Sequence, residues 1–252
     1  MPALPSVSVC FPAYNEGPNV AAVLESAHGL LADSGLDYEI LVCDDGSTDG
    51  TAGIINDITR RRPRMRAIYH ASNQGIRATF EHLYREASKE FVFLNSTDGQ
   101  WETRILLDLL PLTREWDVII ATRRDKHYRF TRSVVSWGFN EIPRLLFGVR
   151  TRDAGAVKLV RREIIERFAL VSRSPFSEAE RLVRAARAGY RITDHPVETS
   201  VRRTGRSRGV SAHLVFAALM DVARVWRALR TQPAGANVAH TPVSESSNAD
   251  RQ

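Results

Sequence analysis

Carboxylates gather in three short segments of the first half of the chain, each directly after an apolar run. Glu16 lies in residues 12–17, Asp44 and Asp45 begin residues 44–51, and Asp98 lies in residues 95–100. Hard cations such as Mg²⁺ and Mn²⁺ take oxygen ligands, often one or two carboxylates together with phosphate oxygens. We therefore expect Asp98 to bind such a cation. Asp44 and Asp45 are suited to accept hydrogen bonds from a base or a ribose.

The residues that follow Asp45 have a second interpretation. Residues 46–50 read Gly-Ser-Thr-Asp-Gly, a composition that is also typical of a turn between a strand and a helix. For residues 47–49 the turn interpretation is preferred, and a direct binding role remains the alternative. For Asp44 and Asp98 the functional interpretation is preferred.

The charge of the chain is distributed unevenly. Residues 1–122 carry 10 Lys and Arg against 17 Asp and Glu, whereas residues 123–252 carry 25 against 12. An acidic half suits a divalent cation, and a basic half suits phosphates or an anionic membrane surface. Nucleic acid is not expected as a partner, because the sequence has neither zinc-ligand spacing nor an RNA-binding signature.

The elements that must position these residues alternate along the first half. Apolar runs predict strands at 7–11, 39–43, 67–69, 91–94 and 117–121. Helical spacing of apolar residues predicts helices at 21–31, 54–58, 78–87 and 106–112. This order predicts an α/β fold, a Rossmann-like, mostly parallel sheet flanked by helices. Because ligands bind beyond the carboxyl ends of such strands, the acidic segments should meet at one edge.

The second half is predicted as an acceptor region that completes one domain. Its expected elements are a strand at 156–160, a helix at 178–188, a strand at 191–197 and a helix at 212–230. Two basic loops, 123–132 and 201–209, accompany them. We expect a single domain at 1–230, with a nucleotide-binding half at 1–122 and an acceptor half at 123–230. Residues 231–252 are expected to be a disordered tail, because they carry few apolar side chains.

The motifs, taken in order, resemble those of a known enzyme family. They are Pro12-Ala13-Tyr14-Asn15-Glu16, Asp44-Asp45-Gly46-Ser47-Thr48-Asp49-Gly50-Thr51, Asn73-x-Gly75, Asp98-Gly99-Gln100, Arg132-x-x-x-Ser136, Asp153, residues 158–162 and 178–192, and Arg203-x-Gly205-x-Ser207. This series is similar to the family-2 inverting glycosyltransferases of GT-A fold. Within that family it most resembles the polyprenyl-phosphate (dolichyl-phosphate-mannose-synthase-like) branch. The resemblance covers about residues 6–210 and rests on the order of the motifs, since each motif alone is weak.

The resemblance implies a role for each matching residue. The donor, a GDP- or UDP-linked sugar, would be held by Pro12, Tyr14, Glu16, Asp44, Asp45 and Gly75, with Arg203 and Arg206 on a loop closing over its diphosphate. Asp98 and Gln100 would hold Mg²⁺ or Mn²⁺, and Arg123, Arg132 and Ser136 would face the acceptor phosphate. One position departs from the pattern: Ser96 stands where the family's Asp-x-Asp has its first carboxylate, so metal binding should be weaker.

The expected reaction is transfer of a hexose to polyprenyl phosphate with inversion at the anomeric carbon. A phosphate acceptor is anionic near neutral pH and needs cations more than a base. A hydroxyl acceptor on a sugar or metabolite is the first alternative, and it would need a general base among Asp153, Glu178 and Glu180. A degenerate, non-catalytic nucleotide-sugar-binding protein is the second alternative, suggested by Ser96.

A lipid acceptor implies a peripheral position at the inner, cytoplasmic face of a membrane. Neither a secretory signal nor a spanning helix is expected from the sequence. Residues 137–147 and the helix at 212–230, with Phe216, Trp226 and a stripe of arginines, could lie on the membrane surface or pack on the core. Cys10 and Cys43 are predicted to be buried free thiols. The histidines show no metal-binding spacing and are given no role.

Overall fold

A seven-stranded sheet forms the centre of the protein. The computed structural model describes residues 4–124, 144–149, 151, 155–198 and 212–231. In the sheet the strands follow the order β3-β2-β1-β4-β6-β5-β7. Their bounds are β1 Val7–Ala13, β2 Tyr38–Asp44, β3 Met65–Tyr69, β4 Phe91–Leu94, β5 Val118–Arg123, β6 Lys158–Arg161 and β7 Ile192–Val197. The fold class predicted from the sequence is confirmed.

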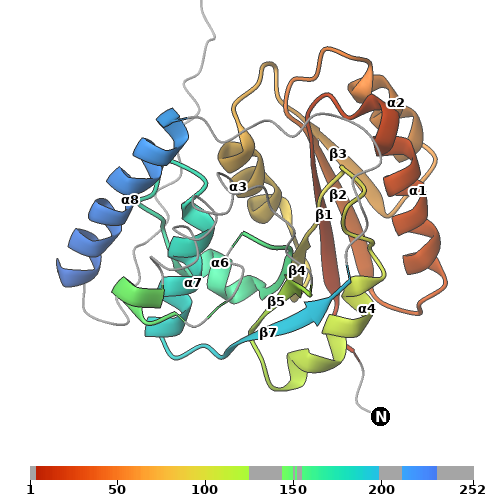
Figure 1. The fold of residues 1–252 in the computed structure, drawn as a ribbon. Helices are drawn as coiled ribbons and strands as arrows, with labels where there is room; N and C mark the ends of the chain where they lie inside the picture. The colour runs from red at the N-terminus through yellow and green to blue at the C-terminus, as the bar shows by residue number, and fades with distance from the viewer. Residues whose placement is uncertain (1–3, 125–143, 150, 152–154, 199–211, 232–252) are drawn as a thin grey trace, which may run out of the picture.

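Helices flank this sheet (Figure 1). They are α1 Gly17–Ala32, α2 Thr51–Thr59, α3 Ile76–Glu86, α4 Ile105–Leu109, α6 Arg162–Arg167, α7 Ser177–Arg187 and α8 Ala212–Thr231, with a 3-10 helix at Leu110–Arg114. Figure 1 shows α1 and α2 at one end of the molecule and α8 at the other, with the strands between them. Of the helices in the described part of the chain, none is long and apolar enough to cross a membrane.

The apolar runs of the sequence explain the central strands. Side chains at Val7, Val9 and Phe11 are fully buried, and so are those from Ile40 to Cys43. Strands that are covered on both faces read as continuous apolar runs rather than as alternating patterns. Both cysteines are buried and free, as the sequence predicts.

Six strands run parallel, and β6 alone is antiparallel to its neighbours β4 and β5. The carboxyl ends of β1, β2, β4, β5 and β7 therefore lie at one edge of the sheet. Because β6 runs the other way, it begins at this same edge, with Lys158 opposite Leu94 and Ile120. The sequence predicts this strand two residues too early, and it predicts neither its direction nor the helix α6.

The first strand, predicted at 7–11, continues through Pro12 to Ala13. Successive residues of β1 make their backbone hydrogen bonds on opposite sides of the strand. Val7 and Ala13 bond on the β2 side, and the Cys10 carbonyl accepts the Asn95 N–H on the β4 side. Pro12 faces the β4 side, beyond the last residue of that strand. Its missing N–H therefore leaves no ladder bond unmade. Its carbonyl accepts a hydrogen bond from Thr97 Oγ1 at 2.8 Å, which ties the strand end to the loop after β4.

Toward the other end of the chain, α8 ends at Thr231, one residue past the expected end of the domain. The proposed tail beyond it lies outside the described residues.

Candidate active site

A pocket of about 370 Å³ opens at the carboxyl edge of the sheet, over β1, β2 and β4. It is lined by Pro12, Ala13, Tyr14, Glu16, Asp45, Asn73, Gly75, Ile76, Thr79, Ser96, Thr97 and Asp98. Six of the eight residues that the sequence assigns to the donor or the cation in this half are therefore brought together: Pro12, Tyr14, Glu16, Asp45, Gly75 and Asp98. This is the edge at which ligands bind in open α/β sheets.

Asp45 organises one wall of the pocket. Its carboxylate is buried and accepts hydrogen bonds from the backbone N–H groups of Gln74 at 2.8 Å and Gly75 at 2.9 Å. It also accepts a bond from Nδ1 of His70 at 2.7 Å. Gly75 has φ +86° and ψ 159°, a conformation open essentially only to glycine. Asp45 thus holds the turn before α3 against the end of β2.

Asp44 is buried at the end of β2 with one carboxylate oxygen engaged and one unsatisfied. Oδ2 accepts the Ser47 N–H at 3.1 Å. Oδ1 is buried and has no hydrogen-bond partner in the part of the chain that the structure describes. A buried acceptor without a partner is costly, so such groups usually meet a ligand or an ordered water. Asp44 is not among the residues that line the pocket.

Residues 15–17 and 47–51 are joined by hydrogen bonds. Ser47 Oγ accepts the Asn15 N–H at 2.8 Å, and Asn15 Oδ1 accepts the Thr48 N–H at 2.8 Å. Asp49 Oδ2 accepts the Gly17 N–H at 3.2 Å. Asn15 itself has φ +52°, the left-handed conformation that asparagine tolerates. These contacts agree with the turn interpretation of residues 47–49, which do not line the pocket.

Asp98 lies half-buried in the loop after β4. Its Oδ1 accepts the N–H of Gln100 at 3.1 Å, and its own N–H donates to Ser96 Oγ at 3.2 Å. Within the described residues Oδ2 of Asp98 makes no hydrogen bond, so that oxygen is available to a cation. Gln100 contributes its backbone to this loop but does not line the pocket. One carboxylate and neutral oxygens fit Mg²⁺ or Mn²⁺ when phosphates supply further ligands.

Arg123 ends β5 at the same edge, on the far side of β6. Three strand spacings separate β1 from β5 in the sheet order, about 14 Å at the usual spacing. The Arg123 guanidinium lies over the Trp101 ring, 4.8 Å from its centroid. Arg132, Ser136, Asp153, Arg203 and Arg206 lie outside the described residues.

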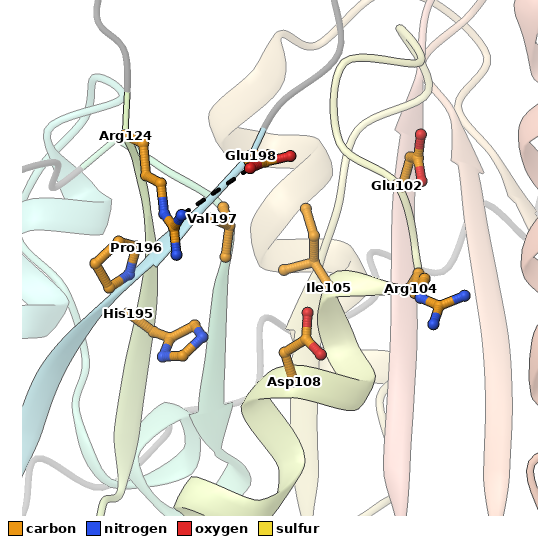
Figure 2. A pocket seen from close by; sticks show the side chains of 9 residues that line it. All are labelled: Glu102, Arg104, Ile105, Asp108, Arg124, His195, Pro196, Val197 and Glu198. Carbon is orange, nitrogen blue, oxygen red and sulfur yellow. Dashed lines mark ion pairs between the residues drawn. The ribbon is translucent and has the colours of Figure 1, made fainter.

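A second pocket, of about 450 Å³, lies between α4 and the end of β7 (Figure 2). In Figure 2, Arg124 points toward Glu198, with Nη1 and Oε1 4.0 Å apart. Arg124 and Glu198 directly precede two segments of the sequence, 125–143 and 199–211. The first contains Arg132, expected at the acceptor phosphate, and the second contains Arg203 and Arg206, expected at the donor diphosphate. The sequence does not indicate this pocket, because its residues come from three separated segments that share no motif.

The two glutamates expected as base candidates lie on α7, and both carboxylates are engaged within the protein. Glu178 accepts hydrogen bonds from Lys158 Nζ at 2.8 Å and from the Tyr84 hydroxyl at 2.9 Å. Glu180 accepts the N–H groups of Val171 and Ser172, and it pairs with Arg184 Nε at 2.7 Å. Neither lines the pocket over β1, β2 and β4.

The charge on Glu178 is stabilised by its surroundings. Burial raises the pKa of Glu178, but the charges of Lys158 and Arg181 and the bonds from Lys158 and Tyr84 outweigh burial and leave that pKa below its usual value. Arg181 is itself buried and pairs with Glu81 at 2.6 Å. The group is an ionised, internally compensated cluster beside the start of β6.

Comparisons with known proteins all point to glycosyltransferases. A model of glycosyl transferase family 2 matches residues 8–178. An undecaprenyl-phosphate mannosyltransferase of Micrococcus luteus is 25% identical over 243 residues, which cover 90% of this chain and 98% of that protein. CsbB of Bacillus subtilis is 32% identical over 165 residues, 63% of this chain and 49% of that protein, so the match spans about half of that relative.

A solved structure shares the fold. The mannosyltransferase PcManGT from Pyrobaculum calidifontis, in complex with GDP-Man and Mn²⁺, superposes with a TM-score of 0.60 at 18% identity, covering 94% of this chain and 77% of that one. At this identity the likeness establishes architecture alone. With the family match over more than half of its length, the chain belongs to glycosyltransferase family 2 and has the GT-A fold.

Proposed function

We propose that this glycosyltransferase moves a hexose from a nucleotide diphosphate sugar to a polyprenyl phosphate, with inversion at the anomeric carbon. The observation that carries the proposal is the pocket at the carboxyl edge, where Asp98 and the backbone turn held by Asp45 face one space. The undecaprenyl-phosphate mannosyltransferase that aligns along almost all of its length supports the acceptor class.

The donor would bind between the loops after β1, β2 and β4. Asp44 Oδ1 would accept a hydrogen bond from the base or ribose, which satisfies its buried oxygen. Pro12, Tyr14 and Glu16 would form the opposite wall. Asp98, with Gln100 supporting its loop, would hold Mg²⁺ or Mn²⁺ beside the diphosphate. The bound cation would supply charge stabilisation for the leaving nucleotide diphosphate.

The acceptor would approach from the β5 and β7 side of the edge. A lipid monophosphate is already anionic, so it requires cations and correct orientation rather than a base. Arg123 would contribute one such cation, with Arg132 and Ser136 also facing the acceptor phosphate. Arg203 and Arg206 are proposed to close over the donor diphosphate. The engagement of Glu178 and Glu180 by buried cations and N–H groups favours this acceptor over a hydroxyl that needs a free carboxylate base. Asp153 is proposed to position the acceptor or to act as a base.

The membrane contact is proposed to involve α8. This helix buries Ala218, Asp221, Val225 and Leu229 toward the protein. It leaves Phe216, Leu219, Met220 and Trp226 exposed. An apolar face accompanied by Arg227 and Arg230 is typical of helices that lie in an anionic membrane surface. We place the enzyme at the cytoplasmic face, where it would meet nucleotide sugars.

The proposal is tested by donor turnover with purified protein, Mn²⁺ or Mg²⁺, and a panel of GDP- and UDP-linked sugars. We expect nucleotide diphosphate to be released only when a short polyprenyl phosphate is present, and the product anomer, read by NMR, to be inverted. Release with a sugar or metabolite hydroxyl instead would support the first alternative. Tight donor binding without release for every acceptor would support a degenerate binding protein, the reading that Ser96 suggests.

A further inference from the structure

Three side chains with metal-binding atoms meet behind the donor pocket, although they are distant in the sequence. Cys43 lies near the end of β2, His70 follows β3, and His82 lies on α3. One ligand atom of each lies within 4.8 Å of the other two. Cys43 Sγ is 3.7 Å from His70 Nε2, which in turn is 2.9 Å from His82 Nδ1. No other described group of His, Cys, Asp and Glu side chains meets in this way.

The tautomer of His70 suits a metal ligand. An ionised carboxylate can only accept hydrogen bonds, so the 2.7 Å contact with Asp45 Oδ1 places a proton on Nδ1 of His70. In the neutral ring, Nε2 then carries a lone pair, and it faces Cys43 and His82. A carboxylate bonded to the far nitrogen is the usual support of a metal-binding histidine, since it fixes the tautomer and the ring orientation.

The distances are close to those of a tetrahedral zinc site. Zn–N bonds of about 2.05 Å and Zn–S bonds of about 2.3 Å imply about 3.4 Å between two nitrogens and about 3.6 Å between sulfur and nitrogen. The measured sulfur–nitrogen distance, 3.7 Å, fits directly. The two rings lie within 16° of parallel with centroids 5.2 Å apart, and His70 Nε2 approaches His82 Nδ1 to 2.9 Å. Because His70 Nε2 carries a lone pair, the 2.9 Å contact places the proton of His82 on Nδ1. Ion binding would shift that proton to Nε2 of His82 and rotate the ring slightly to admit the ion.

We propose that Cys43, His70 and His82 bind a transition-metal ion of the Zn²⁺ type, with water in the fourth position. Thiolate and imidazole ligands select such ions, whereas the oxygen ligands around Asp98 select Mg²⁺ and Mn²⁺. The two sites are therefore separate in place and in chemistry. His82 is half-buried and gives the ion a route from the surface, while Cys43 and His70 are buried.

The site is coupled to the donor pocket through one carboxylate. Asp45 bonds to His70 on one side and to the N–H groups of Gln74 and Gly75 on the other. An ion on His70 would stabilise this chain of contacts and with it the pocket wall at Gly75. Burial and the charges of Asp45 and Asp44 raise the pKa of Cys43 to about 12, so ion binding must displace the thiol proton.

The test is titration of the chelator-treated full chain with Co²⁺, without nucleotide. We expect one equivalent to produce tetrahedral ligand-field bands and a thiolate-to-Co²⁺ charge-transfer band, which Zn²⁺ then abolishes by displacement. Cys43→Ala should lose the charge-transfer band. His82→Gln should weaken affinity by roughly tenfold or more.

Matched controls separate this site from other causes. Cys10→Ala removes the other buried free thiol, on the neighbouring strand β1, and should leave the bands unchanged. Asp98→Asn should also leave them unchanged, because the cation at Asp98 has no thiolate ligand. Circular dichroism and melting temperature confirm that each variant is folded. Absence of the charge-transfer band in folded wild-type protein at excess Co²⁺, or an equal band in folded Cys43→Ala, would overturn the proposal.

Discussion

At the scale of single residues, Asp98 is the carboxylate on which the proposed chemistry depends most. We expect Asp98→Asn to lower metal-dependent turnover by about 100-fold or more, because charge on the leaving diphosphate loses several kcal/mol of stabilisation. Nucleotide diphosphate release at saturating Mn²⁺ measures the effect. The control is Asp57→Asn, which changes an exposed carboxylate on α2 and should leave turnover intact. Equal rates in the two variants would remove Asp98 from the mechanism.

Ser96 allows the opposite experiment, a gain of metal affinity. Ser96 lines the pocket, and its Oγ lies 3.2 Å from the N–H of Asp98. We expect Ser96→Asp to tighten Mn²⁺ binding, because affinity for hard cations rises with the number of charged ligands. Calorimetric titration with Mn²⁺ and a nucleotide diphosphate checks this. Ser96→Asn, which adds size without charge, is the control and should bind no better than wild type.

The sequence allows six residues of the pocket lining to be predicted, because each follows a strand and falls in a short motif. It does not separate the neighbours Asp44 and Asp45. In the structure Asp45 accepts three hydrogen bonds and lines the pocket. Asp44 does not line it and keeps one buried oxygen without a partner in the described chain. Nor does the sequence predict the Cys43–His70–His82 cluster, since its members lie 27 and 12 positions apart, on β2, after β3 and on α3.

At the scale of elements, the loop after β2 depends on a glycine with no room for a side chain. Gly46 has φ +68°, and a Cβ there would lie 2.5 Å from the backbone carbon of Ser72. We expect Gly46→Ala to destabilise the fold by about 1–3 kcal/mol or more through strain and collision. The matched control is Gly53→Ala, in α2, where a Cβ meets nothing within 4 Å. That change should add about 0.4–1 kcal/mol to the free energy of unfolding. Urea denaturation measures both, and a neutral Gly46→Ala would contradict the prediction.

The helix α7 is buried on all sides although it carries several charges. Every residue from Ser177 to Ala185 is buried. Glu178→Gln would leave the buried Lys158 ammonium without its charge partner, and removal of one member of such a pair typically costs about 3–5 kcal/mol. Glu166→Gln, on an exposed pair of α6, is the control and should change stability little.

The same carboxylate should give the protein an acid-sensitive stability. Its pKa is lower in the folded protein than in the unfolded chain, so its stabilising contribution is complete above the unfolded value and is lost as pH falls through the folded value. The stability gap between wild type and Glu178→Gln should therefore be largest near neutral pH and should shrink below about pH 4.5. Urea denaturation across pH measures it. A gap that does not change with pH would show that Glu178 is not ionised.

At the scale of the whole molecule, the alternation of strands and helices is sufficient to predict the parallel half of the sheet. It is insufficient for the acceptor half, where the antiparallel β6 enters between β4 and β5. Val157, Leu159 and Val160 make this segment largely apolar, a pattern that is compatible with either direction. Its direction follows from long-range pairing with Phe91–Leu94, which no local pattern records.

One face of α8 is apolar and exposed. The opposite face is held to the rest of the protein by Asp221. The Asp221 carboxylate is buried and accepts the N–H groups of Arg173 at 2.9 Å and Ser174 at 2.7 Å. The outer face exposes 64% of Phe216 and 41% of Trp226. Insertion of these two rings into a bilayer interface would remove apolar surface from water, and arginines on the same side would favour anionic lipid.

We therefore expect the protein to sediment with anionic vesicles at low salt and to bind them less at high salt. The double variant Phe216→Ser and Trp226→Ser should bind at least about tenfold more weakly, since burying one such ring contributes about 1.5–3 kcal/mol. Leu4→Ser, at an exposed apolar position near the N-terminus, is the control and should bind as wild type. If all three proteins bind equally, or none binds, α8 is not the membrane contact. If only the double variant is impaired, the exposed face of α8, opposite Asp221, is the membrane contact.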